Sequence, residues 1–156
     1  MATKWPLMEL RGPVVTDKDV DAFEKSLGLA LPSEYRQFLL DVNGGSLDES
    51  CAGFAFGVVN RLFCLKHDEE SWNLQIRAER ARKSLPHRDL LFVGHDEGGA
   101  KLLLMLSGDH RGEVWFLTDP DVRPPGSNPR VSWHDRRDMK KVAATWSEFL
   151  AALAPL

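Results

Sequence analysis

Residues 27–45 read LGLALPSEYRQFLLDVNGG, and this stretch decides how the chain folds. Pro32 suits the first helical position, because its missing N–H would be unpaired there anyway. Four apolar side chains then recur at the spacing of one helix face: Tyr35, Phe38, Leu39 and Val42. Asn43, Gly44 and Gly45 tolerate positive φ, so the backbone can turn sharply out of the helix. The stretch therefore predicts a helix with a fixed start, a fixed end and one buried face.

A second helix is predicted immediately before it, from about Thr16 to Leu27. Thr16 can cap its N-terminus, and Asp17 and Asp19 lie in the first turn, where the helix dipole favours negative charge. Val20, Phe23 and Leu27 share one face. Gly28 can supply the left-handed residue that ends the helix.

In the middle of the chain the spacing of apolar residues changes from a helical to a strand-like pattern. Residues 53–59 and 61–65 are short, aromatic and β-branched, and they indicate two strands. A helix is expected at about 71–85, with one apolar face formed by Leu74, Ala78, Ala81 and Leu85. Trp72 and Ile76 fall on a different side of this helix, next to Arg80 and Lys83.

Three nearly apolar runs predict further strands at 90–94, 101–106 and 113–118. Segment 119–130 is too rich in proline and glycine for regular structure. The last predicted helix runs from about Met139 to Leu153, with Asp138 as its cap. Its apolar face comprises Val142, Trp146, Phe149, Leu150 and Leu153.

Length and composition indicate one globular domain spanning 1–156. The 156 residues are 43% hydrophobic and 28% charged, and the formal net charge is −3. That small charge argues against a chain that seeks phosphate or coats membranes. Cys51 and Cys64 match no zinc or redox spacing, so we interpret them as free thiols in a reducing cytoplasm. No apolar run suits an export signal or a membrane span, which favours a cytoplasmic location.

The order of these elements resembles the SUKH superfamily, whose members resemble fungal cell-wall-synthesis regulators and include bacterial toxin immunity proteins. The matching N-terminal residues are Leu27, Gly28, Leu31, Pro32, Tyr35, Phe38, Leu39, Asn43, Gly44 and Gly45. The second half matches at 91–94, 96–99, 102–106, 112–115 and 142–153, and these ranges include Gly99, Trp115 and Trp146. The chain departs at Ala100 and Lys101, where the family often has an acidic residue after the glycines.

The resemblance implies an α+β fold, with helices packed on a twisted, mainly antiparallel sheet. It also implies a protein that binds another protein and performs no chemistry. The family as a class has no known catalytic residues, so the resemblance assigns no catalytic residue and no cofactor to this chain. Many bacterial relatives bind a toxin, often a nuclease, and block its action. Other relatives act as regulators or scaffolds.

Catalytic and metal-binding patterns are weak in this sequence. No two histidines have the i, i+4 spacing that favours metal on a helix, although 67–70 and 95–97 offer histidine beside acids. A hydrolase or metal enzyme would use His95, Asp96 and His134. Adjacent residues such as His95 and Asp96 rarely point the same way on a strand. The sequence has no nucleophile elbow, P-loop or Rossmann glycine pattern.

Two surfaces are candidates for partner binding. The first is Trp72 and Ile76 flanked by Arg80 and Lys83, because Trp and Arg are enriched among residues that dominate binding energy. The second is the acidic set of Asp48, Glu49, Asp96 and Glu97, which could mimic a nucleic-acid backbone toward a basic nuclease. Direct nucleic-acid binding is disfavoured, because Arg77, Arg80, Arg82, Lys83 and Arg88 form no single stripe.

We therefore predict a cytoplasmic immunity protein that neutralises a cognate toxin. The alternatives are a regulatory or scaffold protein of the same fold, a small hydrolase, and a nucleic-acid binder.

Overall fold

The computed structural model describes residues 5–118 and 137–155. In that part of the chain one antiparallel sheet runs in the order β1-β2-β4-β5-β6-β7-β8, and β3 pairs with β4 beside this path. The strands are β1 (Met8–Arg11), β2 (Gly45–Leu47), β3 (Gly53–Phe54), β4 (Gly57–Leu62), β5 (Leu90–Asp96), β6 (Lys101–Met105), β7 (Val114–Leu117) and β8 (Met139–Ala143).

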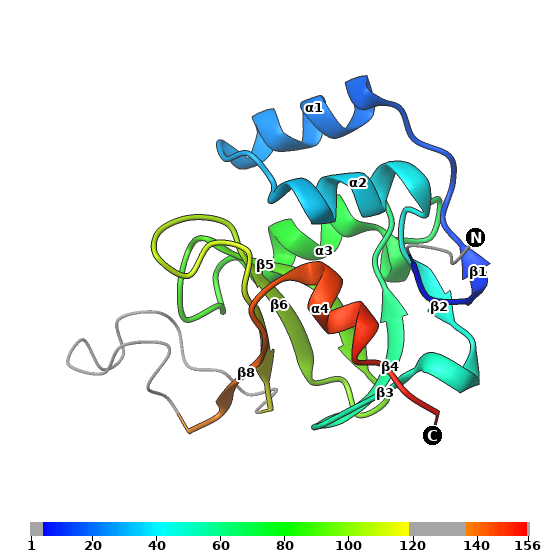
Figure 1. The fold of residues 1–156 in the computed structure, drawn as a ribbon. Helices are drawn as coiled ribbons and strands as arrows, with labels where there is room; N and C mark the ends of the chain where they lie inside the picture. The colour runs from blue at the N-terminus through cyan, green and yellow to red at the C-terminus, as the bar shows by residue number, and fades with distance from the viewer. Residues whose placement is uncertain (1–4, 119–136, 156) are drawn as a thin grey trace.

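Four α-helices lie against this sheet in the described residues: α1 (Asp17–Leu27), α2 (Ser33–Asp41), α3 (Leu74–Ala81) and α4 (Trp146–Ala151). Figure 1 shows α1 and α2 side by side above one end of the sheet and α4 in front of its strands. The described residues also form two 3-10 turns, at Glu49–Cys51 and Glu70–Trp72. The predicted fold class, α+β with helices packed on a mainly antiparallel sheet, is confirmed.

The first two helices end where the sequence indicates. Thr16 and Asp19 form a reciprocal capping box, in which the Asp19 carboxylate accepts the Thr16 N–H at 2.8 Å. Gly28 closes α1 in the left-handed conformation, at φ 74°. Pro32 lies one position before the helical position predicted for it. It is the N-cap of α2, with ψ 137°, and the first helical residue is Ser33.

The turn that follows α2 is held by the buried Asn43. This residue has φ 58°, and its side-chain amide donates to the carbonyl oxygens of Pro13 and Leu65 at 2.8 Å each. Its side-chain oxygen accepts the Leu65 N–H, also at 2.8 Å. A Cβ on Gly45 would lie 2.0 Å from the Leu10 carbonyl oxygen, so only glycine fits between these strands.

The middle of the chain differs from the predicted pattern. Residues 53–59 do not form one strand, because the chain turns at 55–56 and pairs β3 with β4 as a hairpin. Strand β4 continues to Leu62, so it ends within the second predicted run. The predicted helix at 71–85 is shorter, because Asn73 caps α3 by accepting the Ile76 N–H at 3.0 Å. At the other end Pro86 disfavours helix for Leu85.

The three central strands lie where they were predicted, and β5 extends two residues further, to Asp96. Gly99 turns the chain from β5 into β6 at φ 88°. The C-terminal prediction was wrong in its first half. Residues 139–143 form β8 on the edge of the sheet, and only Trp146–Ala151 is helical, capped by Thr145 instead of Asp138. The predicted segment at 119–130 lies outside the described residues.

An aromatic cluster joins α2 to α4. The Trp146 ring lies edge-on to Tyr35, with centroids 4.9 Å apart, and 5.3 Å from Phe38. All three side chains are at most 1% exposed. The apolar stripe predicted for residues 35–42 is therefore buried against the final helix as well as the sheet. A hydrogen bond from the Ser147 N–H to Glu34 adds to this contact.

Candidate partner-binding surface

The acidic residues predicted to bind a partner lie in two separate turns. The Asp48 carboxylate accepts both the N–H and the hydroxyl of Ser50, and so caps the first 3-10 turn. The Asp96 carboxylate accepts the Ala100 N–H at 2.8 Å in the β5–β6 turn. Glu49 and Glu97 are exposed beside them. Asp48 and Asp96 therefore have local structural roles, and the exposed charges are those of Glu49 and Glu97.

The second predicted set surrounds the start of α3. Trp72 is half-buried, stacks on His67 and lies under the Arg61 guanidinium, 4.2 Å from the ring centroid. Ile76 is half-buried as well. Arg80 is exposed and forms an ion pair with Glu70 at 3.0 Å, while Lys83 is exposed. Trp72 is therefore covered by polar side chains from β4 and its following loop.

A different group of side chains is brought together by the sheet. Arg61 on β4 is opposite His95 on β5, and His95 is opposite Lys101 on β6. Arg77 reaches the same place from α3. We call these four residues, Arg61, Arg77, His95 and Lys101, the cationic surface. All four side chains are half-buried.

Aromatic rings form the floor of the cationic surface. The Arg77 guanidinium lies 5.0 Å from the Phe63 ring centroid and 5.5 Å from that of Phe92. The Lys101 ammonium lies 5.2 Å from the centroid of Phe92, which is on the neighbouring strand β5. Cations attract the faces of such rings, so the rings hold these charges in place without neutralising them.

No ion pair between described residues involves Arg61, Arg77 or Lys101. Among the described residues the buried Nε atoms of Arg61 and Arg77 have no hydrogen-bond partner, whereas Arg61 Nη1 donates to the Ser71 carbonyl at 3.1 Å. Burial lowers the pKa of Arg77, and the neighbouring charges of Arg61 and Arg80 lower it further. Burial also lowers the pKa of Lys101, with a smaller contribution from Arg77. The group therefore concentrates positive charge that the described structure does not balance.

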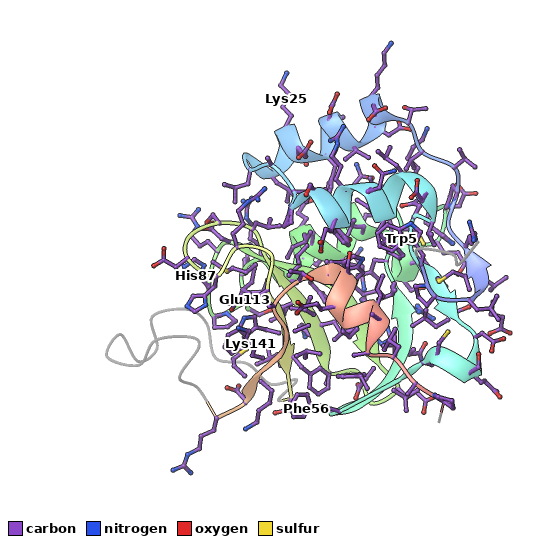
Figure 2. The ribbon with its side chains drawn as sticks, in the orientation of Figure 1. Trp5, Lys25, Phe56, His87, Glu113 and Lys141 are labelled. Atoms are coloured by element: carbon purple, nitrogen blue, oxygen red, sulfur yellow. The ribbon has the colours of Figure 1, made fainter. Side chains whose placement is uncertain are left out.

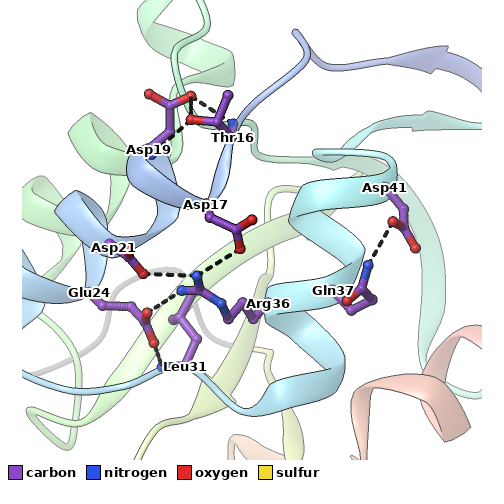
Figure 3. Close-up of polar contacts among 9 residues, drawn as sticks. All are labelled: Thr16, Asp17, Asp19, Asp21, Glu24, Leu31, Arg36, Gln37 and Asp41. Carbon is purple, nitrogen blue, oxygen red and sulfur yellow. Dashed lines mark hydrogen bonds and ion pairs between the residues drawn. The ribbon is translucent and has the colours of Figure 1, made fainter.

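The half-buried arginine of the helix pair, Arg36, shows the opposite arrangement. Arg36 on α2 faces three carboxylates on α1, those of Asp17 at 3.2 Å, Asp21 at 2.9 Å and Glu24 (Figure 3). Glu24 also accepts the Leu31 N–H at 2.6 Å. Acids on α1 thus surround the Arg36 guanidinium. Within the described residues the cationic surface has no such ion pairs, and this difference makes it a candidate site for an anionic partner.

His95 was considered as a catalytic base, but its geometry does not form a dyad. Its Nδ1 bonds the backbone oxygen of Asp96 at 2.8 Å, while the Asp96 carboxylate is engaged by the Ala100 N–H. Burial lowers the pKa of His95, and so do Arg61 and Arg77, against a raising effect of Asp96. His134 lies outside the described residues. No group of three His, Cys, Asp or Glu side chains in the described ranges could hold a metal ion.

A hollow of about 450 Å³ opens between the end of α1, α3 and the start of β5. Five of its twelve lining residues are leucine, and its charged residues are Glu79, Arg82 and Arg88. The described lining contains no histidine or cysteine. The hollow thus has a mixed wall, and the Ser26 hydroxyl in it donates to the Phe23 carbonyl at 2.7 Å.

Sequence reasoning missed the cationic surface as a unit. It weighed Arg77 only for nucleic-acid binding and His95 only for catalysis, and it assigned no role to Arg61 or Lys101. The departure at Ala100-Lys101 was the one available signal, because it places a basic residue where an acid is usual. Whether the eight predicted contact residues bind a partner stays a prediction.

The model of the SMI1/KNR4 family (SUKH-1) matches residues 14–152, which include both helices of the N-terminal signature and the final helix. No curated protein matches the chain. None of the helices in the described residues is long and apolar enough to cross a membrane.

Proposed function

The chain belongs to the SMI1/KNR4 family (SUKH-1), which includes immunity proteins, and from this we propose that it binds and neutralises a bacterial toxin. The family match across residues 14–152 is the observation that carries the proposal. Inhibition would be non-catalytic, by occlusion of the toxin's active site, in the cytoplasm of the cell that makes the toxin.

The features of the described surface support a binding role over catalysis. In the cationic surface Arg61, Arg77 and Lys101 each lie over an aromatic ring, and these charged groups are suited to contact an anion. Rigid strands and a helix carry these groups, so they are preorganised for a partner. A preorganised surface loses little entropy on association.

Co-expression with the toxin encoded beside this gene tests the proposal. The toxin alone should stop growth, and the toxin with this chain should permit it. Purified chain and a toxin inactivated at its active site should elute together on gel filtration. Growth arrest despite folded, abundant chain, together with separate elution, would contradict the proposal. A complex with a non-toxic neighbour would favour the regulatory alternative instead.

A further inference from the structure

We propose that the cationic surface binds an acidic segment of a partner protein, with Arg61, Arg77 and Lys101 contacting its carboxylates. The inference rests on the proposed function in one respect, because the toxin is the partner that would carry this segment. It adds the location of the contact and the chemistry of the partner.

The geometry prepares these groups for an anion. Register in the sheet places Arg61, His95 and Lys101 on neighbouring strands, and α3 adds Arg77 from above Phe63 and Phe92. Like charges held this close repel each other, and each is already partly desolvated. A carboxylate placed among them would reduce this repulsion. Guanidinium groups suit this role because their planar N–H groups match a carboxylate in pairs.

Carboxylates of a protein fit the surroundings better than a nucleic-acid backbone does. A polyphosphate chain needs a broad, continuous basic track. The cationic surface offers three guanidinium or ammonium groups, those of Arg61, Arg77 and Lys101, on two strands and one helix. A short acidic segment needs only this small set of charges.

Binding of a labelled hexaglutamate peptide, followed by fluorescence anisotropy at low salt, tests the inference. The test variant carries Arg77→Met and Lys101→Met, which keep an apolar stem over the rings and remove two charges. The control carries Lys18→Met and Lys25→Met, the same charge change on exposed positions of α1 (Lys25 points away from the molecule in Figure 2). We expect the affinity of the test variant to fall by on the order of tenfold, and that of the control to change little.

Thermal unfolding accompanies the binding assay. The test variant should unfold no lower than the wild type, because it loses repelling charges. If the double variant does not fold, Lys101→Met alone carries the test, with an expected loss of about threefold. Equal affinity for the peptide in the wild type and the test variant would overturn the inference. So would tighter binding of an oligothymidylate of similar length, lost in the test variant, since that identifies a nucleic-acid site.

The same variants separate this inference from the proposed function. If the wild type and the test variant neutralise the toxin equally well, the inference fails and the function stands. If no toxin is bound but the peptide is bound through Arg77 and Lys101, the function fails and the acid-binding surface stands. If the test variant loses peptide binding and toxin neutralisation while the control variant keeps them, the inference and the proposed function are both supported.

Discussion

The buried amide of Asn43 combines two tasks that can be separated by substitution. Its left-handed backbone favours glycine, while its side chain satisfies both the N–H and the carbonyl of Leu65. Asn43→Gly should lose only the hydrogen bonds, about 2 kcal/mol of unfolding free energy. Asn43→Ala should lose about 1 kcal/mol more, because it adds the strain of the left-handed conformation. Urea denaturation of both variants measures the difference, and equal losses would assign the whole effect to the hydrogen bonds.

The two thiols should differ in reactivity. Burial raises the pKa of Cys64 to about 12, so its thiolate is scarce at neutral pH, and the side chain is fully buried. Cys51 is partly exposed. An aromatic disulfide reagent at pH 8 should modify one thiol in the native protein and the second only after denaturant is added. Native Cys51→Ser should give no rapid reaction, and a rapid reaction there would show that Cys64 is accessible.

The joint between α1 and α2 depends on the fork of Arg36, which reaches three carboxylates. Asp17 and Asp21 are well exposed, so solvent weakens their ion pairs with Arg36. The ion pair with the more buried Glu24 therefore contributes most. Arg36→Met should cost about 2 kcal/mol. Arg36→Lys should recover only part of this, since an ammonium cannot make the paired contacts. Full recovery by lysine in denaturant titrations would mean that charge alone matters.

The joint between α2 and α4 depends on Trp146. Its ring is 1% exposed, and its indole N–H has no hydrogen-bond partner in the described part of the chain. Trp146→Phe keeps an aromatic ring and removes the unsatisfied donor, so we expect a loss below about 1.5 kcal/mol. Trp146→Ala should cost about 4 kcal/mol because it leaves a cavity. Thermal and urea unfolding would check the order, which similar losses in the two variants would contradict.

The elements that could be predicted are those whose ends are marked by capping or turn residues in their own sequence. Thr16, Gly28 and the Asn43–Gly45 turn mark helix ends by local rules, and these hold in the structure. Strand β8 was mistaken for helix because residues 142–153 have helical apolar spacing and the preceding lysines extend it. Pairing with β7 decides its state, and that pairing is a tertiary contact that no local window contains.

The cationic surface could not be predicted for a similar reason. Its members come from β4, α3, β5 and β6, and they meet only because Arg61 pairs with His95 and His95 with Lys101. Irregular register between Val59 and Arg61 and between Phe92 and Gly94 sets which side chains share a face. A shift of one residue in either strand would move them apart.

Across the whole fold, the acid stability of the protein should depend on Glu113. Burial raises the pKa of this carboxyl, but hydrogen bonds from His110, Lys141 and Trp115 together lower it below its ordinary 4.5. Figure 2 shows Glu113 beside Lys141 of β8. A carboxyl whose pKa is lowered by folding stabilises the native state above its unfolded pKa.

That contribution is therefore complete above about pH 4.5 and is lost as the pH falls through the lower folded value. Glu113→Gln should be less stable than the wild type at pH 7, and the difference should shrink on acidification. Unfolding free energies measured across this range test the sign. A difference that stays constant with pH would remove Glu113 from the acid response.

The contact between α2 and α4 joins residues that are far apart in the chain, since the Ser147–Glu34 hydrogen bond spans 113 positions. Closing so long a loop is entropically costly, and chains dominated by non-local pairing reach the native state in about milliseconds to seconds. Until Trp146 docks, the apolar strands at 101–105 and 114–117 lack the cover of α4. The kinetically vulnerable species is thus an almost complete sheet awaiting its last helix, and this species is the one expected to self-associate during refolding.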